Sequence, residues 1–178
     1  MAKRHTRIKL DDGGEAGRHR ILASIENGPD TNNRSIEQLA RTLKAKHKLY
    51  GSVELTAETF DAFKRNFDAN TYGQKIFIDV AHKPENGAAA EVKRVFTQGD
   101  ALLAEIEWMP KGIKAFNEDG YRYFSIDFED DYEDRETGKK HGPMLFGAGM
   151  VTRPFVKHIR PSEGPGRMFF SEDSGTLI

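Results

Sequence analysis

The chain has 178 residues, of which 37% are hydrophobic and 31% are charged, a composition typical of one globular domain. Its formal net charge is -1, so no overall positive field points to nucleic acid or an acidic membrane as a partner. Cysteine is absent, which excludes disulfides, thiolate nucleophiles and zinc–thiolate sites and is compatible with a reducing cytosol. No apolar run approaches the roughly 20 residues that a membrane span needs.

Residues 1–48 are predicted to be an N-terminal extension that contains a helix. Four apolar residues follow helical spacing: Ile36, Leu39, Ala40 and Leu43. Ser35 with Gln38 resembles a capping box at the start of that helix. On this pattern the helix ends near Lys48.

A strand, a helix and a second strand are predicted next. Gly51 to Leu55 has the residue types of a strand, and Thr56 is suited to cap the helix that follows. Three phenylalanines recur on one face of that helix and are expected in the core: Phe60, Phe63 and Phe67. Residues 70–73 then break the helix, and residues 74–82 form a β-rich run.

The second half of the chain is predicted to be mostly strand. Residues 91–97 and 101–109 are expected to pair as a hairpin that turns at a glycine. Pro110 suits the first position of a short helix. Two further strands are expected at 121–129 and 144–152, with a charged excursion between them.

Together these elements place one folded domain at residues 49–160, followed by a flexible C-terminal tail at 161–178. Seven or so strands with two or three helices predict an α+β fold. We expect a compact, partly closed antiparallel β-barrel-like sheet with the helices outside it.

Period-two alternation in the 121–129 strand separates two faces. Phe124, Ile126 and Phe128 face the core, whereas Ser125 lies on the opposite face and is expected to point outward. A nucleophile on a strand is held firmly, which suits catalysis. The same pattern also fits a small polar residue on a solvated surface, and by itself it favours that simpler interpretation.

His82 ends a β-forming run and precedes Lys83-Pro84, which must leave the strand. Its parity with Ile78 turns it toward the core, so a bulge or the strand end must redirect it if it is catalytic. The alternative is a partly buried histidine bonded to a carbonyl. Asp79 and His82 have no partner motif of the metal-ligand kind, so we expect neither a metal nor a cofactor.

Four stretches, in one order along the chain, resemble the Mu-type prohead proteases of tailed phages and, more distantly, the serine peptidase half of capsid scaffolding proteins. They are Ile78–His82, Glu107–Pro110, Tyr121–Phe128 and Met150–Pro154. The family elements read I-D-Y-E-H, E-W-T-P, Y-R-Y-L-S-P-V-F and L-T-N-x-P. This chain departs from the family elements at Ala81, Met109, Ile126 and Arg153. None of these departures replaces the serine or the histidine.

The resemblance implies a serine endopeptidase with Ser125 as nucleophile and His82 as general base. A third group should orient the imidazole, and four candidates stay open, with an acidic one favoured: Asp127, Glu107, Asp79 and His141. The family is similar to herpesvirus assemblins, which use a second histidine and imply an assemblin-like fold. That similarity places an oxyanion site or substrate groove at three residues: Thr152, Arg153 and Gly149.

The resemblance also implies the biological setting. Prohead proteases cleave the phage scaffold and often the major capsid protein inside the immature capsid, in the host cytoplasm. We also consider that the chain cleaves itself and associates with further copies of itself. We expect neither nucleic acid nor a membrane as a partner. The alternative is a non-enzymatic, capsid-associated structural or scaffold-type protein that keeps the protease fold.

Overall fold

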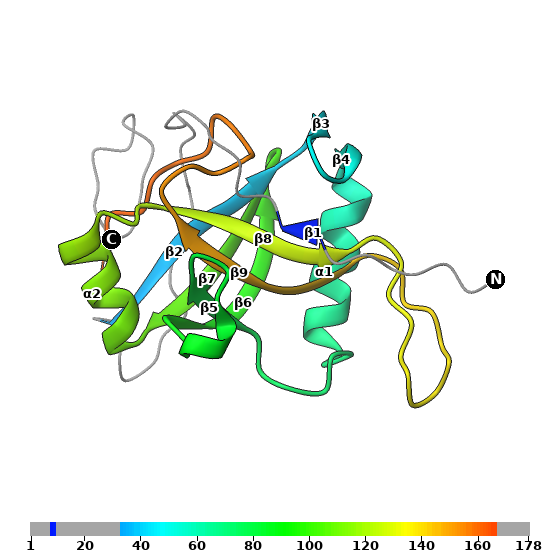
Figure 1. The fold of residues 1–178 in the computed structure, drawn as a ribbon. Coiled ribbons are helices and arrows are strands. Elements are labelled where there is room, and N and C mark those ends of the chain that lie inside the picture. Colours follow the sequence, from blue (N-terminus) through cyan, green and yellow to red (C-terminus); the bar gives the residue numbers. More distant parts are fainter. Residues whose placement is uncertain (1–7, 10–32, 167–178) are drawn as a thin grey trace.

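The structure, a computed structural model, describes residues 8–9 and 33–166. Within them, a seven-stranded sheet has the order β1-β8-β9-β5-β6-β7-β2, and a separate hairpin pairs β3 with β4 (Figure 1). The strands are β1 (Ile8–Lys9), β2 (Arg34–Arg41), β3 (Leu43–His47), β4 (Gly51–Leu55), β5 (Phe77–Val80), β6 (Ala90–Gln98), β7 (Ala101–Trp108), β8 (Tyr123–Glu129) and β9 (Met144–Val151). The helices are α1 (Ala57–Asp68), α2 (Pro110–Asp119) and the 3₁₀ turn η2 (Pro84–Asn86).

The six strands from β8 to β2 curl into a half-barrel, so that β2 at one edge contacts β8 near the other. The predicted α+β class, with a curved sheet and two α-helices, is therefore confirmed. The expectation of wholly antiparallel pairing is wrong at one place, because β5 and β9 run parallel. These two strands are far apart in the chain, so no tight turn forces them to be antiparallel.

The core lies between the sheet and α1, as the phenylalanine pattern predicts. Thr56 caps α1, and its side chain accepts a hydrogen bond from the Thr59 amide. Phe60 and Phe63 are fully buried, and the Phe63 ring packs edge-on against Phe128 of β8 at 5.6 Å. Burying each such side chain contributes about 1.5–3 kcal/mol, so this helix face fixes α1 on the sheet.

The predicted hairpin and second helix are also confirmed. β6 and β7 pair around Gly99, whose φ of 59° is the left-handed conformation that glycine adopts without strain. Pro110 begins α2, and the Phe116 ring of that helix packs against Trp108 at 5.8 Å. Among the described residues, neither of the α-helices is long and apolar enough to cross a membrane.

The helix predicted before Lys48 is wrong for the described residues, which form β2 and β3 instead. β2 pairs with β7, and its register shifts between Gln38 and Ala40. Every residue of β2 from Ser35 to Ala40 is buried, so the strand is covered on both faces, and Ile36, Leu39 and Ala40 are buried whichever face each one occupies. Their spacing therefore imitates a helix. The rest of the predicted extension, apart from β1, lies outside the described residues.

The segment after β9 joins the two edges of the half-barrel. The amide of Ser162 donates to the carbonyl of Arg122, just before β8, and the amide of Gly166 donates to the carbonyl of Arg34 on β2. The Arg160 amide donates to Oε1 of Gln38 on β2. The tail predicted from residue 161 is thus packed on the fold through residue 166, and its remainder lies outside the described residues.

Candidate active site

Ser125 lies in the middle of β8, a strand that is buried on both faces. Phe124 and Ile126 belong to the core as predicted, but Ser125 is only 2% exposed, so the expected outward, solvent-facing position is wrong. Alternation in a strand assigns a residue to a face and does not say what covers that face. Ser125 Oγ is buried and makes no hydrogen bond with a described residue. Leaving such a group unpaired costs about 1–3 kcal/mol, so it calls for an explanation.

Ser125, Gly149 and Asp79 form a row across three adjacent strands, called here the Ser125 row. Ser125 on β8 is the register partner of Gly149 on β9, and Gly149 is the partner of Asp79 on β5. Partners on neighbouring strands share a face, and the strands lie about 4.8 Å apart. The hydroxyl and the carboxylate therefore project from the same face, with their Cα atoms about 10 Å apart.

His82 is redirected at the end of β5, as the sequence requires if it is catalytic. Ala81 and His82 have φ values of 59° and 56°, a left-handed pair that costs non-glycine residues about 1–3 kcal/mol each. Contacts hold this turn in place. The Ala81 amide donates to the carbonyl of Met150 on β9, and the Lys83 amide donates to Oδ1 of Asp79 at 3.1 Å.

The His82 imidazole lies directly over Gly149. A Cβ atom at residue 149 would come within 2.9 Å of His82 Nδ1 and 3.0 Å of Cγ. Such a Cβ would project from the same face as Ser125 and Asp79, because the three are register partners. The ring therefore lies in the row, between the serine and the aspartate. Gly149, which was expected in a substrate groove, here makes the room that the ring occupies.

Two of the four candidates for the third group lie near this row. Asp79 belongs to the row, and its carboxylate accepts a hydrogen bond from the residue next to His82. Asp127 lies two residues from Ser125 on the same face of β8, is 4% exposed, and is the register partner of Gly147. Both carboxylates are thus on the face that holds the serine and the imidazole.

The other two candidates lie elsewhere. Glu107 on β7 is separated from β9 by β5 and β6, and it forms ion pairs with Arg34 and Lys93. His141 lies in the excursion between β8 and β9, where its carbonyl accepts a hydrogen bond from Asn66 of α1. Its ring lies 6.1 Å from that of Tyr132. Their contacts explain both side chains without reference to Ser125.

The residues expected to form an oxyanion site follow the end of β9. Thr152 and Arg153 are exposed and come directly after Val151, the register partner of Tyr123. They are therefore at the β9 end that adjoins the start of β8, three and four residues beyond Gly149. This location leaves their predicted role as a proposal.

A second buried polar cluster, which the sequence did not predict, lies on the other edge of the half-barrel. This Glu37 cluster comprises Glu37, Ser35, Ser162 and Trp108. Oε1 of Glu37 accepts hydrogen bonds of 2.7 Å from the hydroxyls of both Ser35 and Ser162, and Trp108 Nε1 donates to Ser35 Oγ at 2.8 Å. Burial raises the pKa of Glu37 to about 7, although the two serine hydrogen bonds oppose the rise. The partners of Ser35 and Glu37 come from segments 73 and 125 residues away in the chain, so no local pattern indicates this cluster.

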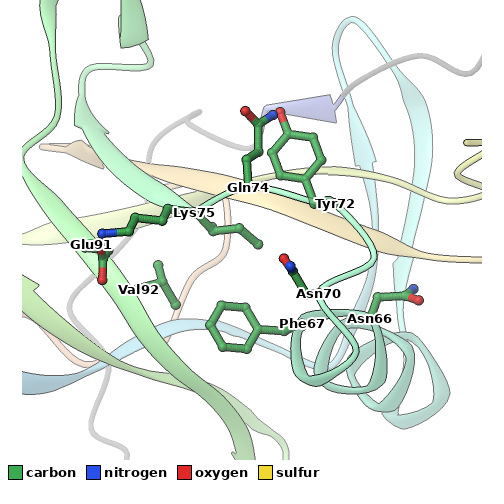
Figure 2. A pocket seen from close by; sticks show the side chains of 9 residues that line it. Asn66, Phe67, Asn70, Tyr72, Gln74, Lys75, Glu91 and Val92 are labelled. Carbon is green, nitrogen blue, oxygen red and sulfur yellow. Dashed lines mark ion pairs between the residues drawn. The ribbon is translucent and has the colours of Figure 1, made fainter. Parts of the chain in front are cut away.

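A cavity of about 310 Å³ lies between the end of α1, the turn that follows it and β6 (Figure 2). Its side chains include the amides of Asn66 and Asn70, and Lys75 beside it pairs with Glu91 at 3.0 Å. None of the lining residues belongs to the Ser125 row. Within residues 8–9 and 33–166, no group of three or more histidine, aspartate or glutamate side chains is arranged to hold a metal ion.

Comparison with models of known protein families identifies the family of the chain. The family model described as Mu-like prophage I protein, N-terminal domain, matches residues 41–161, more than half of the sequence. The chain belongs to this family. The match includes the whole Ser125 row and His82, and it makes the chain a Mu-like phage protein, in agreement with the phage resemblance of its motifs. No curated protein and no solved structure matches the chain significantly.

Proposed function

We propose that this phage protein is a serine endopeptidase of prohead maturation, with Ser125 as nucleophile and His82 as general base. The observation that carries the proposal is the Ser125 row, in which an imidazole lies over a glycine between a serine and an aspartate. Serine, histidine and aspartate in this order form the arrangement that activates a hydroxyl in many unrelated peptidases.

The chemistry follows from the position of each group. The Ser125 hydroxyl attacks a peptide carbonyl carbon while the His82 imidazole takes the hydroxyl proton. The C–N bond then breaks, the proton passes to the leaving amine, and an acyl-enzyme ester forms. Water attacks that ester with the imidazole again taking a proton, which releases the new carboxyl end and restores the serine.

Asp79 is our choice for the third group. Its carboxylate lies at the end of the row beyond the ring, and it accepts a hydrogen bond from Lys83 in the turn that holds His82. A carboxylate in that position orients the imidazole and stabilises its protonated form. Asp127 lies beside Ser125 on the serine's own strand, so it is less suited to act through the far side of the ring.

The substrates proposed are the phage scaffold and major capsid proteins, with the chain itself as a further one. The phage family supports this setting, inside an immature capsid in the host cytoplasm. Confinement raises the effective concentration of substrate, so weak binding of each peptide is sufficient.

A second candidate function is favoured by the burial of Ser125. At 2% exposure the hydroxyl is closed to a peptide carbonyl in this conformation. A capsid-associated structural or scaffold-type protein that keeps the fold without the activity would need no access to it. The two functions therefore differ in whether the hydroxyl can be reached and is reactive.

A fluorophosphonate probe tests this difference without a known substrate, because it forms a covalent bond only with an activated serine. We expect intact mass spectrometry to find one adduct, on Ser125, and none in Ser125→Ala or His82→Gln. Ser52→Ala, which removes an exposed serine on β4, is the matched control and should label fully.

Cleavage of purified scaffold and capsid proteins should follow the same pattern among these variants. A folded wild-type chain that neither reacts with the probe nor cuts these proteins would favour the structural function. An adduct that persists in Ser125→Ala would reject the serine assignment.

A further inference from the structure

A cleft of about 820 Å³ lies beside the end of β8 and the start of β9, and neither the motifs nor the proposed chemistry uses it. One side is formed by residues 71–74, the turn that precedes β5. The other is formed by the hairpin between β8 and β9, yellow in Figure 1, which projects past the sheet. The cleft is lined by Thr71, Tyr72, Gly73, Gln74, Glu129, Tyr132, Glu133, Asp134, Arg135, Glu136 and Phe146.

Three aromatic rings from three separate segments meet in this cleft. Phe146 of β9 lies between Tyr72 of the turn and Tyr132 of the hairpin, with ring centroids 5.1 Å and 5.5 Å away. Both tyrosines pack edge-on against it, at interplanar angles of 76° and 78°. Aromatic faces attract cations through their quadrupole, and arginine and lysine side chains are their commonest partners.

The charge of the cleft also favours a cation. Four carboxylates line it, against the single cation Arg135: Glu129, Glu133, Asp134 and Glu136. Burial raises the pKa of Tyr132, and the nearby charges of Asp134 and Glu129 raise it further, as expected in a negative potential. A bound lysine or arginine would gain both ion pairs and ring contacts.

The hairpin wall is held in place, so the cleft is part of the fold. The Tyr132 amide donates to the carbonyl of Gly142, and the His141 amide donates back to the carbonyl of Tyr132. The Asn66 side chain of α1 donates to the carbonyls of His141 and Pro143 at 3.1 Å and 2.9 Å. A preformed site loses less conformational entropy when it binds a ligand.

The cleft also lies along the face that carries the Ser125 row. Glu129 is four residues from Ser125 on the same strand, about 13 Å away along β8. The β8–β9 register shifts between Asp127 and Phe128, but Phe128 still packs into the core against Phe63, so Glu129 keeps the face of Ser125. We propose that this cleft binds a lysine or arginine side chain of an extended polypeptide partner. Resting on the proposed function, that partner is the substrate, and the basic residue lies about four positions from the bond that is cut.

The test is peptide binding to the full chain carrying Ser125→Ala, so that the result does not depend on cleavage. Fluorescence anisotropy would compare a dye-labelled decapeptide containing two lysines with the same peptide acetylated at both. We expect acetylation to weaken binding at least about 10-fold, because it removes the charge. Raising the salt from 20 to 200 mM should weaken binding of the unmodified peptide only.

Two cleft variants should each weaken binding of the lysine peptide by a similar factor. One is the single substitution Tyr132→Leu, and the other is the double substitution Glu133→Gln with Glu136→Gln. The matched control is Glu54→Gln with Glu58→Gln, which removes two exposed carboxylates outside the cleft and should leave the affinity unchanged. Equal affinity for the two peptides, or no effect of the cleft variants, would overturn the proposal.

The alternative occupant to be tested is the basic N-terminal sequence of the chain itself. Residues 1–7 contain Lys3, Arg4 and Arg7, and β1 pairs Ile8 with Phe128, the residue before Glu129. If a separate partner is the occupant, as proposed, substituting these three cations by glutamine should leave the affinity for the lysine peptide unchanged. A rise of about 10-fold or more would show that the chain's own terminus is the occupant, and would overturn the proposal of a separate partner.

Discussion

The curled sheet holds two buried polar groups of residues, the Glu37 cluster and the Ser125 row, and they differ in how their hydrogen bonds are satisfied. In the Glu37 cluster the carboxylate accepts from two serines, and one of these serines accepts from Trp108. In the Ser125 row the serine hydroxyl has no hydrogen-bond partner among the described residues. Both are deeply buried, so burial alone does not separate them.

This difference separates the buried polar residues that stabilise the fold from those that do not. A satisfied buried network stabilises one arrangement of the chain, and the Glu37 cluster does so where residues 157–166 join β2 to β8. A buried hydroxyl that the fold does not use costs stability and persists where it has another task. On this argument we assign Glu37 a structural role and propose a functional one for Ser125.

The largest effect on activity is expected from the substitution Asp79→Asn. We expect a loss of about 10⁴-fold in kcat, as in other triads whose aspartate becomes an amide. The fold should survive, because the asparagine oxygen can still accept from the Lys83 amide. Asp127→Asn is the matched control on the same face. The measurement is cleavage rate against pH, together with a melting curve.

A purely structural role for Asp79 would lower the melting temperature and leave the pH profile of the remaining activity unchanged. Full activity in Asp79→Asn, with the loss appearing in Asp127→Asn instead, would transfer the third position to Asp127.

The next largest effect is expected from Gly149→Ala. The added Cβ would lie 2.8–3.0 Å from backbone and ring atoms of His82, so the imidazole must move. We expect about a 1000-fold loss of cleavage or probe labelling, since misplacing a catalytic group by about 1 Å already costs about 100-fold. Far-UV circular dichroism would establish that the sheet is intact. Wild-type activity in this variant would contradict the position assigned to the ring.

The smallest effect is expected in the Glu37 cluster and tests its contribution to the stability of the fold. The pKa of Glu37 is about 7 in the fold, against 4.5 as its ordinary value. Between these values the folded chain keeps a proton that the unfolded chain releases. Glu37 therefore contributes stability that is complete below about pH 4.5 and is lost as the pH rises to about 7, amounting to about 3 kcal/mol.

Urea unfolding at several pH values would measure this contribution as the difference between wild type and Glu37→Gln. The difference should change with pH across that window, while the exposed-site control Glu54→Gln should follow the wild type. Parallel curves for wild type and Glu37→Gln would mean that Glu37 does not hold its proton in the fold.

Local patterns predicted those elements whose cause is local. Thr56 and the buried Phe60 and Phe63 give α1 its start and its inner face. Gly99 gives the hairpin its turn, and Pro110 gives α2 its first residue. The strand alternation around Ser125 also assigned its face correctly, while missing that this face is covered.

The sequence by itself thus determined α1, α2 and the hairpin, because each depends on neighbours within a few residues. The serine and the histidine were selected by the resemblance of their motifs to a phage family, and local spacing alone did not select them. Only the tertiary structure decided that residues 34–41 form a bulged strand, that β5 lies parallel to β9, and that Asp79, Gly149 and Ser125 share a row. These features depend on pairing between strands far apart in the chain. Such pairing sets register and burial together, and no local spacing of residues encodes it.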